Sequence, residues 1–394
     1  MADLVPLESN NMRNMIKSNI KYSYNDISII PNELSHISHR SECCPFLDNG
    51  KLPIFTAPMS TVVNINNFEL FEMNNINAIL PRSVYVDDRL EFAKNGKWTA
   101  FSLTEFERIF ADEDNSIEFK SGPVKHILID VANGHMAKIY ELVKRCKTIL
   151  GDQIEIMIGN IANPKTYRDA ALAGASYVRL GIGSGSGCIT SSNTGIHFPM
   201  ASLIDETVDV RNNLMENDEV QEYLKLKHFQ MPKIIADGGI RNYSDVIKAL
   251  ALGADYVMIG GLFASIIESA APIHLKTDTG LVPCRDDRKI VDLHGKLYFE
   301  EKNKCVTEVP CPLVKVFYGM ASSRGQIDLT GKKNKTSEGI EKVISVTTNL
   351  YKWSENMASY IQSAMSYLGI YDVYKLRNAE KCVISNNTYA SINK

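Results

Sequence analysis

Short β-rich runs alternate with segments of helical periodicity along this 394-residue chain, so the sequence predicts an α/β protein, a (β/α)8 TIM barrel. Eight such runs are present, which is the number that closes this kind of barrel. Polar and glycine residues follow the later runs, where such barrels carry their chemistry. A doubly wound parallel sheet is the competing fold. The predicted strands cover residues 53–57, 78–80, 98–102, 126–130, 155–159, 177–180, 233–237 and 256–259.

Helical segments separate most of these strands. Apolar residues recur at helical spacing in 136–150, 164–173 and 243–252. Asn163-Pro164 and Asn242 stand at two helix starts, where asparagine is a favoured cap. We expect one barrel domain over residues 1–394, with an N-terminal extension (1–50), an insertion after the eighth strand (about 271–316) and a C-terminal helical segment (about 338–394).

Composition excludes several classes of protein. The chain is 44% hydrophobic and 23% charged, which is ordinary for a globular protein with a large core. A net charge of −3 gives no reason to expect nucleic acid or an anionic membrane as partner. No apolar run reaches the ~18 residues that span a membrane, and the N-terminus has no signal-peptide pattern. The eight cysteines are mostly scattered, so we expect a reduced, cytoplasmic chain.

A glycine-rich loop ending in one cysteine follows the strand at 177–180. Glycines occupy alternate positions from Gly181 to Gly187, and Cys188 comes directly after them. Glycine allows backbone amides and carbonyls to point at a ligand or an ion. A cysteine at the end of such a loop is placed like a nucleophile. A flexible connector with an incidental thiol is the competing interpretation.

Glycine pairs follow the last two predicted strands. Gly238-Gly239 come after the seventh strand and Gly260-Gly261 after the eighth. Backbone amides at such turns bind an anion without a basic side chain. Each pair alone is also compatible with a tight turn between strand and helix. Their occurrence on adjacent strands favours a phosphate site.

Seven stretches, in matching order and spacing, resemble the IMP dehydrogenase/GMP reductase family over roughly residues 22–370. The resemblance implies a TIM barrel, a purine nucleotide monophosphate as substrate, a nicotinamide cofactor and a homotetramer. The CBS pair that many dehydrogenases insert after the second strand is absent, because the third predicted strand follows within about twenty residues. The seven stretches are residues 57–62, 129–134, 181–190, 235–240, 257–261, 317–320 and 337–339.

The resemblance also implies roles for single residues. Cys188 matches the nucleophile that forms a covalent adduct at purine C2, and Thr190 and Glu338 match the pair that transfers protons. Asp237 matches the aspartate that holds the ribose hydroxyls. The positions that match the other substrate contacts are Met59, Ser186, Gly238, Gly239, Gly260, Gly261, Tyr318, Gly319 and Met320; Ser186, Tyr318 and the two glycine pairs are those around the phosphate.

Two further sites follow from the same resemblance. Asp130, Asn133 and Gly134 fall near the nicotinamide cofactor, which is NADPH in a reductase and NAD in a dehydrogenase. The carbonyls of Gly183, Gly185 and Cys188 match a monovalent-cation (K+) site of many dehydrogenases. The residue types suit the chemistry, because a thiolate makes purine C2 tetrahedral and a hydroxyl–carboxylate pair relays a proton.

The direction of the reaction is the next question. Dehydrogenases carry an Arg-Tyr pair on a flap, and none occurs among the seventeen residues between Met320 and Glu338. This absence favours GMP reductase, whereas the sequence Cys188-Ile-Thr190 is the one typical of IMP dehydrogenase. Two hypotheses from different classes are a catalytically silent nucleotide-binding relative and a flavin-dependent barrel. Several positions depart from the family pattern, and they leave open a substrate with a modified purine base. They are Ser60, Pro81-Arg82, Arg324 and Lys335.

Overall fold

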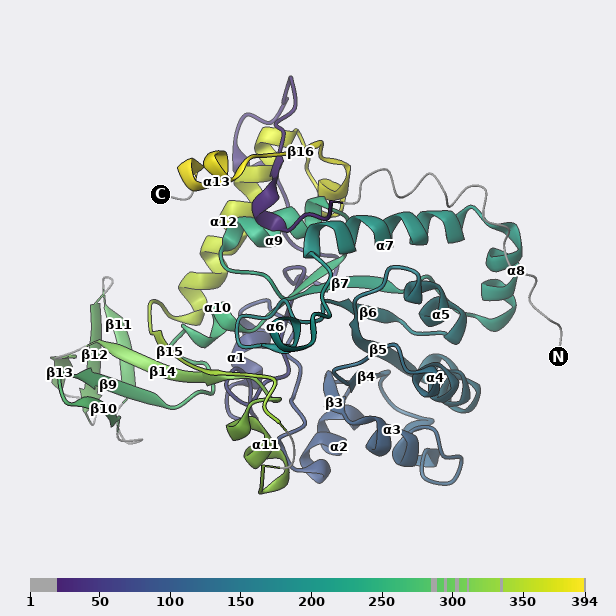
Figure 1. The fold of residues 1–394 in the computed structure, drawn as a ribbon, viewed down its shortest axis with the longest axis horizontal. Coiled ribbons are helices and arrows are strands. Elements are labelled where there is room, and N and C mark those ends of the chain that lie inside the picture. Colours follow the sequence, from purple (N-terminus) through teal and green to yellow (C-terminus); the bar gives the residue numbers. More distant parts are fainter. Residues whose placement is uncertain are drawn as a thin grey trace.

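The computed structural model describes residues 20–284, 289–293, 296–301, 305–309, 312–333 and 336–392. Lys335 lies outside these ranges. The centre of the molecule is a curled, seven-stranded parallel sheet in the order β2-β8-β7-β6-β5-β4-β3, with helices on its outer side (Figure 1). The strands are β2 (Ile54–Thr56), β3 (Thr99–Phe101), β4 (Lys125–Asp130), β5 (Ile154–Ile161), β6 (Tyr177–Leu180), β7 (Lys233–Asp237) and β8 (Tyr256–Ile259).

Seven of the eight predicted strands are confirmed. Each consists mainly of apolar residues that are buried, as expected for parallel strands covered on both faces. The remaining predicted strand, at residues 78–80, does not form a strand in the structure. Single bridges instead join Asn77 to Phe55 on β2 and Leu80 to Thr99 on β3. The two edges of the curled sheet are therefore linked through this short segment.

The helices agree with the predicted alternation. α4, α5 and α9 match the predicted segments within two residues at each end, and Asn242 caps α9 by accepting from the Asp245 amide (3.0 Å). The helices up to α10 are α1 (Phe68–Met73), α2 (Val86–Lys94), α3 (Leu103–Ile109), α4 (Ala137–Leu150), α5 (Thr166–Ala173), α6 (Thr190–Thr194), α7 (Met200–Met215), α8 (Asp218–Lys227), α9 (Tyr243–Ala251) and α10 (Gly261–Ala264).

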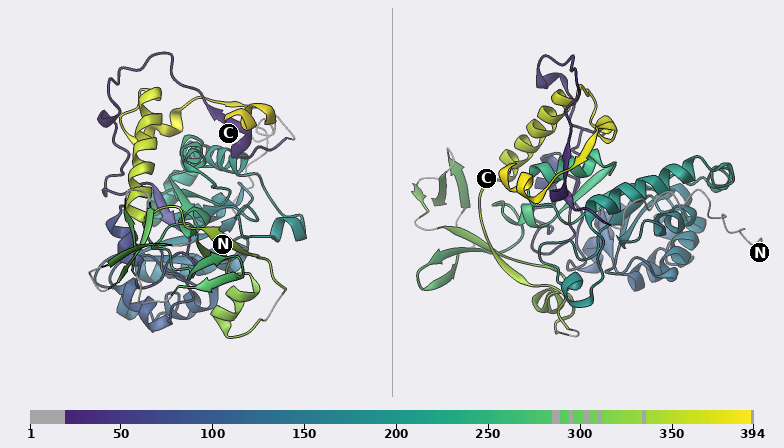
Figure 2. Two further views of the ribbon diagram at one scale, coloured as in Figure 1. Left: turned by 90° about the vertical axis from the view of Figure 1, so that its left-hand side faces the viewer. Right: turned by 45° about the horizontal axis from the view of Figure 1, so that its top comes forward.

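The chain between α10 and α11 (Ser323–Thr330), together with β15 after α11, forms antiparallel strands beside the central sheet, at the left of Figure 1. One sheet has the order β10-β9-β14-β15 and another β11-β12-β13. Their members are β9 (Ile273–Thr277), β10 (Gly280–Pro283), β11 (Lys289–Leu293), β12 (Lys296–Glu301), β13 (Cys305–Glu308), β14 (Leu313–Tyr318) and β15 (Glu341–Ser345). The view turned by 45° in Figure 2 shows the same strands extending away from the central sheet.

The C-terminal segment, predicted as helical from about 338, begins with β15 and continues with α12 (Leu350–Leu368) and α13 (Asn386–Ile392). The strand forms because residues 341–345 pair with β14 along its length. After α12, β16 (Lys381–Val383) pairs with β1 (Ile27–Ile29), so the two ends of the described chain meet. No helix among the described residues is long and apolar enough to cross a membrane.

Candidate active site

A cavity of about 340 Å³ lies at the carboxyl ends of the parallel strands. Its walls come from the segments that follow β2, β4, β5, β6, β7 and β8, and from the two segments around residues 317–321 and 338–339. The predicted site residues that line it are Met59, Asp130, Gly183, Gly185, Ser186, Cys188, Thr190, Asp237, Gly238, Gly239, Gly260, Gly261, Gly319, Met320 and Glu338. Tyr318, Asn133 and Gly134 are not among the lining residues.

A hydrogen-bonded chain joins the three predicted catalytic side chains. The Cys188 thiol lies 3.2 Å from Thr190 Oγ1, and the Thr190 hydroxyl donates to Glu338 Oε2 at 2.8 Å. All three residues line the cavity. The arrangement gives a proton on sulfur a path to a carboxylate through one hydroxyl.

Backbone contacts fix this chain of groups in place. The Ile189 amide donates to the Glu338 carbonyl (2.9 Å), and the Ile340 amide donates to the Gly187 carbonyl (3.0 Å). These two bonds flank an antiparallel bridge between Cys188 and Gly339. The Glu338 amide donates in turn to the Ala321 carbonyl (3.0 Å). The cysteine loop is therefore joined to a segment about 150 residues further along the chain.

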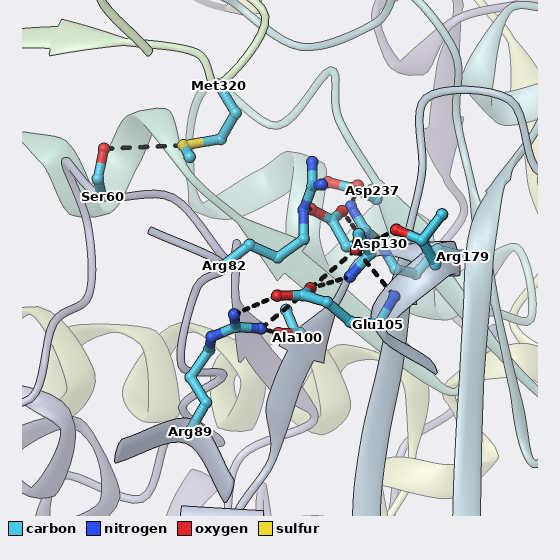
Figure 3. A network of polar contacts seen from close by, with 11 residues as sticks. Ser60, Arg82, Arg89, Ala100, Glu105, Asp130, Arg179, Asp237 and Met320 are labelled. Atoms are coloured by element: carbon cyan, nitrogen blue, oxygen red, sulfur yellow. Dashed lines mark hydrogen bonds and ion pairs between the residues drawn. The ribbon is translucent and has the colours of Figure 1, made fainter. Parts of the chain in front are cut away.

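A network of buried charges forms the floor of the cavity (Figure 3). Arg179 on β6 donates to Asp130 on β4 (3.0 Å) and to Asp237 on β7 (2.9 Å). Arg82 binds the other oxygen of Asp130 at 2.9 Å. Asn160 on β5 donates to Asp237 Oδ2 at 2.7 Å. Side chains from three segments thus hold the two carboxylates in fixed positions.

Electrostatics explains why both carboxylates can be buried here. Burial alone would raise the pKa of Asp130, but the guanidinium groups of Arg82 and Arg179 outweigh it and hold this pKa below its ordinary value. The pKa of Arg179 is raised, because Asp237 and Asp130 outweigh its own burial. Arg179 Nε is buried and has no hydrogen-bond partner among the described residues.

Sequence reasoning did not assign Arg82, Arg179 or Asn160 to the site. Arg179 is a charged residue within an otherwise apolar strand, at its carboxyl end, and this pattern is a usable signal. Its partners come from other strands, so no local pattern identifies them. Ser60, which departs from the family pattern, has its hydroxyl 3.7 Å from the sulfur of Met320 (Figure 3).

Two glycines are required for close packing around the loop. A Cβ on Gly181 would lie 2.1 Å from the Asp237 carbonyl oxygen, and Gly181 has a φ of +129°. A Cβ on Gly261 would lie 2.9 Å from the Ser186 hydroxyl oxygen. The predicted phosphate donors are not all free, since the Gly239 amide donates to the Ser184 carbonyl (2.9 Å). The described residues offer no in-chain partner to the amides of Gly238, Gly260 and Gly261.

The side chains of Phe317 and Tyr318 lie in different environments. Phe317 lines the cavity, whereas Tyr318 is buried and its hydroxyl donates to Asp328 Oδ2 (2.6 Å). Burial, followed by the neighbouring Asp328 carboxylate, raises the pKa of Tyr318 to about 12. Successive residues of a strand point to opposite faces, so only one of the two aromatic rings can face the nucleotide side. Tyr318 does not line the cavity, and its contact with phosphate stays a prediction.

Four of the other predicted ligand groups are already bonded within the chain. Asn133 Oδ1 accepts from the His135 amide (3.0 Å), and Gly134 donates to the Asn160 carbonyl (2.8 Å). In the loop, the Gly183 carbonyl accepts from the Ser191 hydroxyl (3.0 Å) and the Gly185 carbonyl from the Cys188 amide (3.0 Å). The described residues contain no group of three or more His, Cys, Asp or Glu side chains that would hold a metal ion.

Cys188 is joined to a hydroxyl and a carboxylate at the strand ends of a curled parallel sheet. This arrangement is that of an enzyme active site, and comparison with known proteins indicates which kind of enzyme. Residues 114–281 match the family model of the IMP dehydrogenase / GMP reductase domain, which supports this family for the chain.

Individual relatives agree. The GMP reductase of Staphylococcus saprophyticus is 27% identical over 379 residues, covering 93% of this chain and 97% of the relative. The GMP reductase of Staphylococcus aureus strain Newman is 28% identical over 379 residues, covering 93% of this chain and 98% of the relative. Both alignments span nearly the whole of each chain, including the residues outside the matched domain.

Proposed function

We propose that this protein is a purine nucleotide oxidoreductase that reduces GMP to IMP and ammonia with NADPH, through a covalent adduct at Cys188. The observation that carries the proposal is the chain of contacts from the Cys188 thiol through Thr190 to Glu338 inside the cavity. The names of the two Staphylococcus relatives support the choice of GMP as substrate.

The first step is attack of the Cys188 sulfur on C2 of the guanine base. A C–S bond forms, and the 2-amino group leaves as ammonia when its C–N bond breaks. Glu338 and Thr190 deliver the thiol proton to the departing amine, which makes it a neutral leaving group. The carbon that remains is a thioimidate on Cys188, and this is the species that accepts a hydride at C2. Breaking the C–S bond then gives IMP and restores the thiolate.

The nucleotide is oriented by the two ends of the cavity. The free amides of Gly238, Gly260 and Gly261 and the Ser186 hydroxyl suit an anionic phosphate. Asp237 is held by Arg179 and Asn160 and retains oxygen lone pairs for ribose hydroxyls. Phe317 and Met320 supply the apolar surface against which a purine base packs.

NADPH, when bound, supplies the hydride for C2. Asp130, which lines the cavity, is the residue we propose to lie near the nicotinamide group. Asn133 and Gly134 form part of the loop after β4, and we propose that this loop contacts the cofactor at the edge of the cavity. The in-chain bonds of the Gly183 and Gly185 carbonyls leave K+ binding a prediction, and no step above uses a cation.

IMP dehydrogenase is the second candidate, in which IMP would be oxidised to XMP with NAD. One observation favours it. The Thr190–Glu338 pair that protonates an amine in the reductase could remove a proton from water in the dehydrogenase. The described residues between 320 and 338 bring no arginine–tyrosine pair to the cavity, and this favours the reductase.

Four features of the proposal extend beyond the site. We propose a closed (β/α)8 barrel without a CBS insertion, in which the segment that contains residues 78–80 joins the two edges of the seven-stranded sheet through single bridges. We also propose a single domain over residues 1–394, with an N-terminal extension (1–50), an insertion (about 271–316) and a C-terminal segment (about 338–394). A homotetramer and a cytoplasmic location stay predictions from the sequence.

The function is tested by a screen of GMP and IMP against NADPH, NADH, NADP and NAD. The proposal predicts oxidation of NADPH with GMP and the release of ammonia. Steady formation of NADH from IMP and NAD, with no reaction of GMP, would replace it by the dehydrogenase. Nucleotide binding without turnover in any combination would indicate the catalytically silent relative.

A further inference from the structure

A lysine outside the catalytic residues is buried next to the cavity wall. Lys315 lies in the middle of β14, two residues before Phe317, and its side chain has no exposed surface. Its ammonium donates to the Ile267 carbonyl (2.7 Å), the Ser269 carbonyl (2.6 Å) and the Ser269 hydroxyl (2.8 Å). The ion pairs among the described residues include none to Lys315. Three acceptors match the three N–H groups of a lysine ammonium, so the buried charge is fully hydrogen-bonded.

The turn that receives Lys315 is joined to two other walls of the cavity. The Ser269 hydroxyl lies 3.3 Å from the carbonyl of Ala264, the last residue of α10, the helix that Gly261 begins. The Ala270 and Ala271 amides donate to the carbonyls of Val62 and Thr61, at 3.1 Å each. Residues 61 and 62 lie shortly after Met59 along the chain. Three segments that line the cavity therefore meet around one buried ammonium.

We propose that Lys315 is a positioning residue for the nucleotide cavity, whose ammonium joins the strand that carries Phe317 and leads to Met320 to the turn that supports Gly260-Gly261 and the Met59 segment. The inference rests on the proposed function, because it takes a purine nucleotide as the ligand of this cavity. It adds a residue that touches neither nucleotide nor cofactor. Losing the ammonium separates the walls that hold the phosphate from those that hold the base.

The protonation state of Lys315 is set by its surroundings. The residues directly opposite it on β9 and β15 are Ile273 and Ile344, both apolar. Burial lowers the pKa of Lys315 to about 7, and the Glu268 carboxylate acts in the opposite direction. The titratable and charged groups on the elements packed against it are Glu268 in the turn, His274 and Lys276 on β9, and Glu341 and Lys342 on β15.

A neutral lysine amine has two N–H groups and cannot satisfy three acceptors. The positioning contacts are therefore complete below a pH of about 7 and incomplete above it. We expect nucleotide affinity to fall as the pH rises through neutrality. A lysine with only a structural role would leave the ratio of variant to wild-type affinity independent of pH.

The test is calorimetric titration of GMP, and in parallel IMP, between about pH 6 and pH 8, an interval centred on the Lys315 pKa of about 7. Four variants are compared with the wild type: Lys315→Met, Lys315→Arg, Ser269→Ala and the control Lys276→Met. Lys276 is an exposed lysine on the neighbouring strand β9. The readout is the ratio of variant to wild-type Kd at each pH, because the nucleotide phosphate itself titrates near pH ~6.

For Lys315→Met we expect a ratio of about ten or more at the acid end, falling towards one at the alkaline end, where the wild type has lost its own ammonium. Lys315→Arg keeps a charge that does not titrate, so its Kd should lack the wild-type loss of affinity at alkaline pH. Ser269→Ala removes one acceptor and should move the wild-type midpoint to lower pH. Lys276→Met should give a ratio near one throughout.

A Lys315→Met ratio that is the same at every pH would overturn the inference while leaving the proposed function intact. If Lys315→Met does not fold, Ser269→Ala decides, and an unmoved midpoint overturns the inference. A wild type that binds neither GMP nor IMP overturns this inference and the proposed function together.

Discussion

The Thr190 hydroxyl donates to Glu338 Oε2 across 2.8 Å, although 148 positions of sequence separate the two residues. Thr190 begins α6 beside the cysteine loop, and Glu338 is the residue before the bridge between Cys188 and Gly339. The contact depends on two strand-like backbone bonds, and it turns an isolated thiol into one end of a proton path.

Replacing the carboxylate should separate binding from turnover. Glu338→Gln keeps the shape of the side chain but cannot take up a proton, so we expect turnover of GMP to fall by at least about 100-fold. The dissociation constant of GMP should change by less than about threefold, because the phosphate and ribose contacts lie elsewhere. Steady-state kinetics and calorimetry measure the two effects.

The matched control for that variant is Glu341→Gln. Glu341 lies three residues further on, is exposed and faces Arg324 at 3.9 Å. An exposed pair of this kind contributes little, and turnover should stay near wild type. Equal losses in both variants would mean that Glu338 acts through general charge and not through Thr190.

A single methyl group should disturb the phosphate end of the cavity. In Gly261→Ala the new Cβ would lie 2.9 Å from the Ser186 hydroxyl oxygen, so that hydroxyl must move away. We expect the affinity for GMP to fall at least about tenfold, or ~1.4 kcal/mol. Binding of guanosine, which lacks the phosphate, should change little. If guanosine lost as much affinity as GMP, the phosphate would not be bound at this end.

The two aromatic residues at the end of β14 make a clear contrast. Tyr318→Phe removes the hydroxyl and its hydrogen bonds with Asp328 and Ser60 but keeps the ring, so the KM for GMP should stay within about twofold of wild type. Phe317→Ala removes the ring that lines the cavity and should raise this KM by at least about tenfold. A large KM effect of Tyr318→Phe would restore the phosphate contact that the sequence predicted.

The acid stability of the protein should depend on Arg82. Its contact with Asp130 helps to keep the pKa of that carboxyl below the ordinary value, so the pair stabilises the fold at neutral pH. Arg82→Gln should lower the free energy of unfolding at pH ~7 by about 1.5–3 kcal/mol. The difference should vanish as the pH falls through the folded-state pKa of Asp130, because the protonated carboxyl no longer attracts the arginine.

The control for Arg82→Gln is Lys94→Gln, which breaks an ion pair with Glu118 at the surface. Both side chains of that pair are about half exposed, so its loss should cost less than about 1 kcal/mol at any pH. Denaturant titrations at neutral and acid pH measure both variants. An Arg82→Gln effect that persists unchanged in acid would mean that packing, and not the Asp130 charge, causes it.

The sequence was sufficient for most of the fold, because parallel strands are buried on both faces and appear as short apolar runs. Residues 78–80 were one exception, and β15, in the segment predicted as helical, was another. The run at residues 78–80 is only three residues long and ends at Pro81, and its partners on β2 and β3 form only single bridges.

Local sequence patterns likewise identify some of the site residues and not others. Cys188 and the glycine pairs are local signals, since glycine marks backbone that must approach a ligand closely. The choice between Phe317 and Tyr318 was beyond the sequence, because a shift of one residue exchanges the faces of a strand. Arg179 and Lys315 take their roles from partners on distant segments, which no local pattern contains.

The most direct test of the whole account is the stoichiometry of one reaction in the wild type and in Cys188→Ser. The enzyme is incubated with GMP and NADPH, and loss of the nicotinamide absorbance is followed together with release of ammonia. The account predicts one ammonia and one IMP for each NADPH oxidised by the wild type. For Cys188→Ser it predicts loss of both products with GMP binding retained. Turnover of Cys188→Ser within about tenfold of wild type, a difference of only ~1.4 kcal/mol in the barrier, would contradict it.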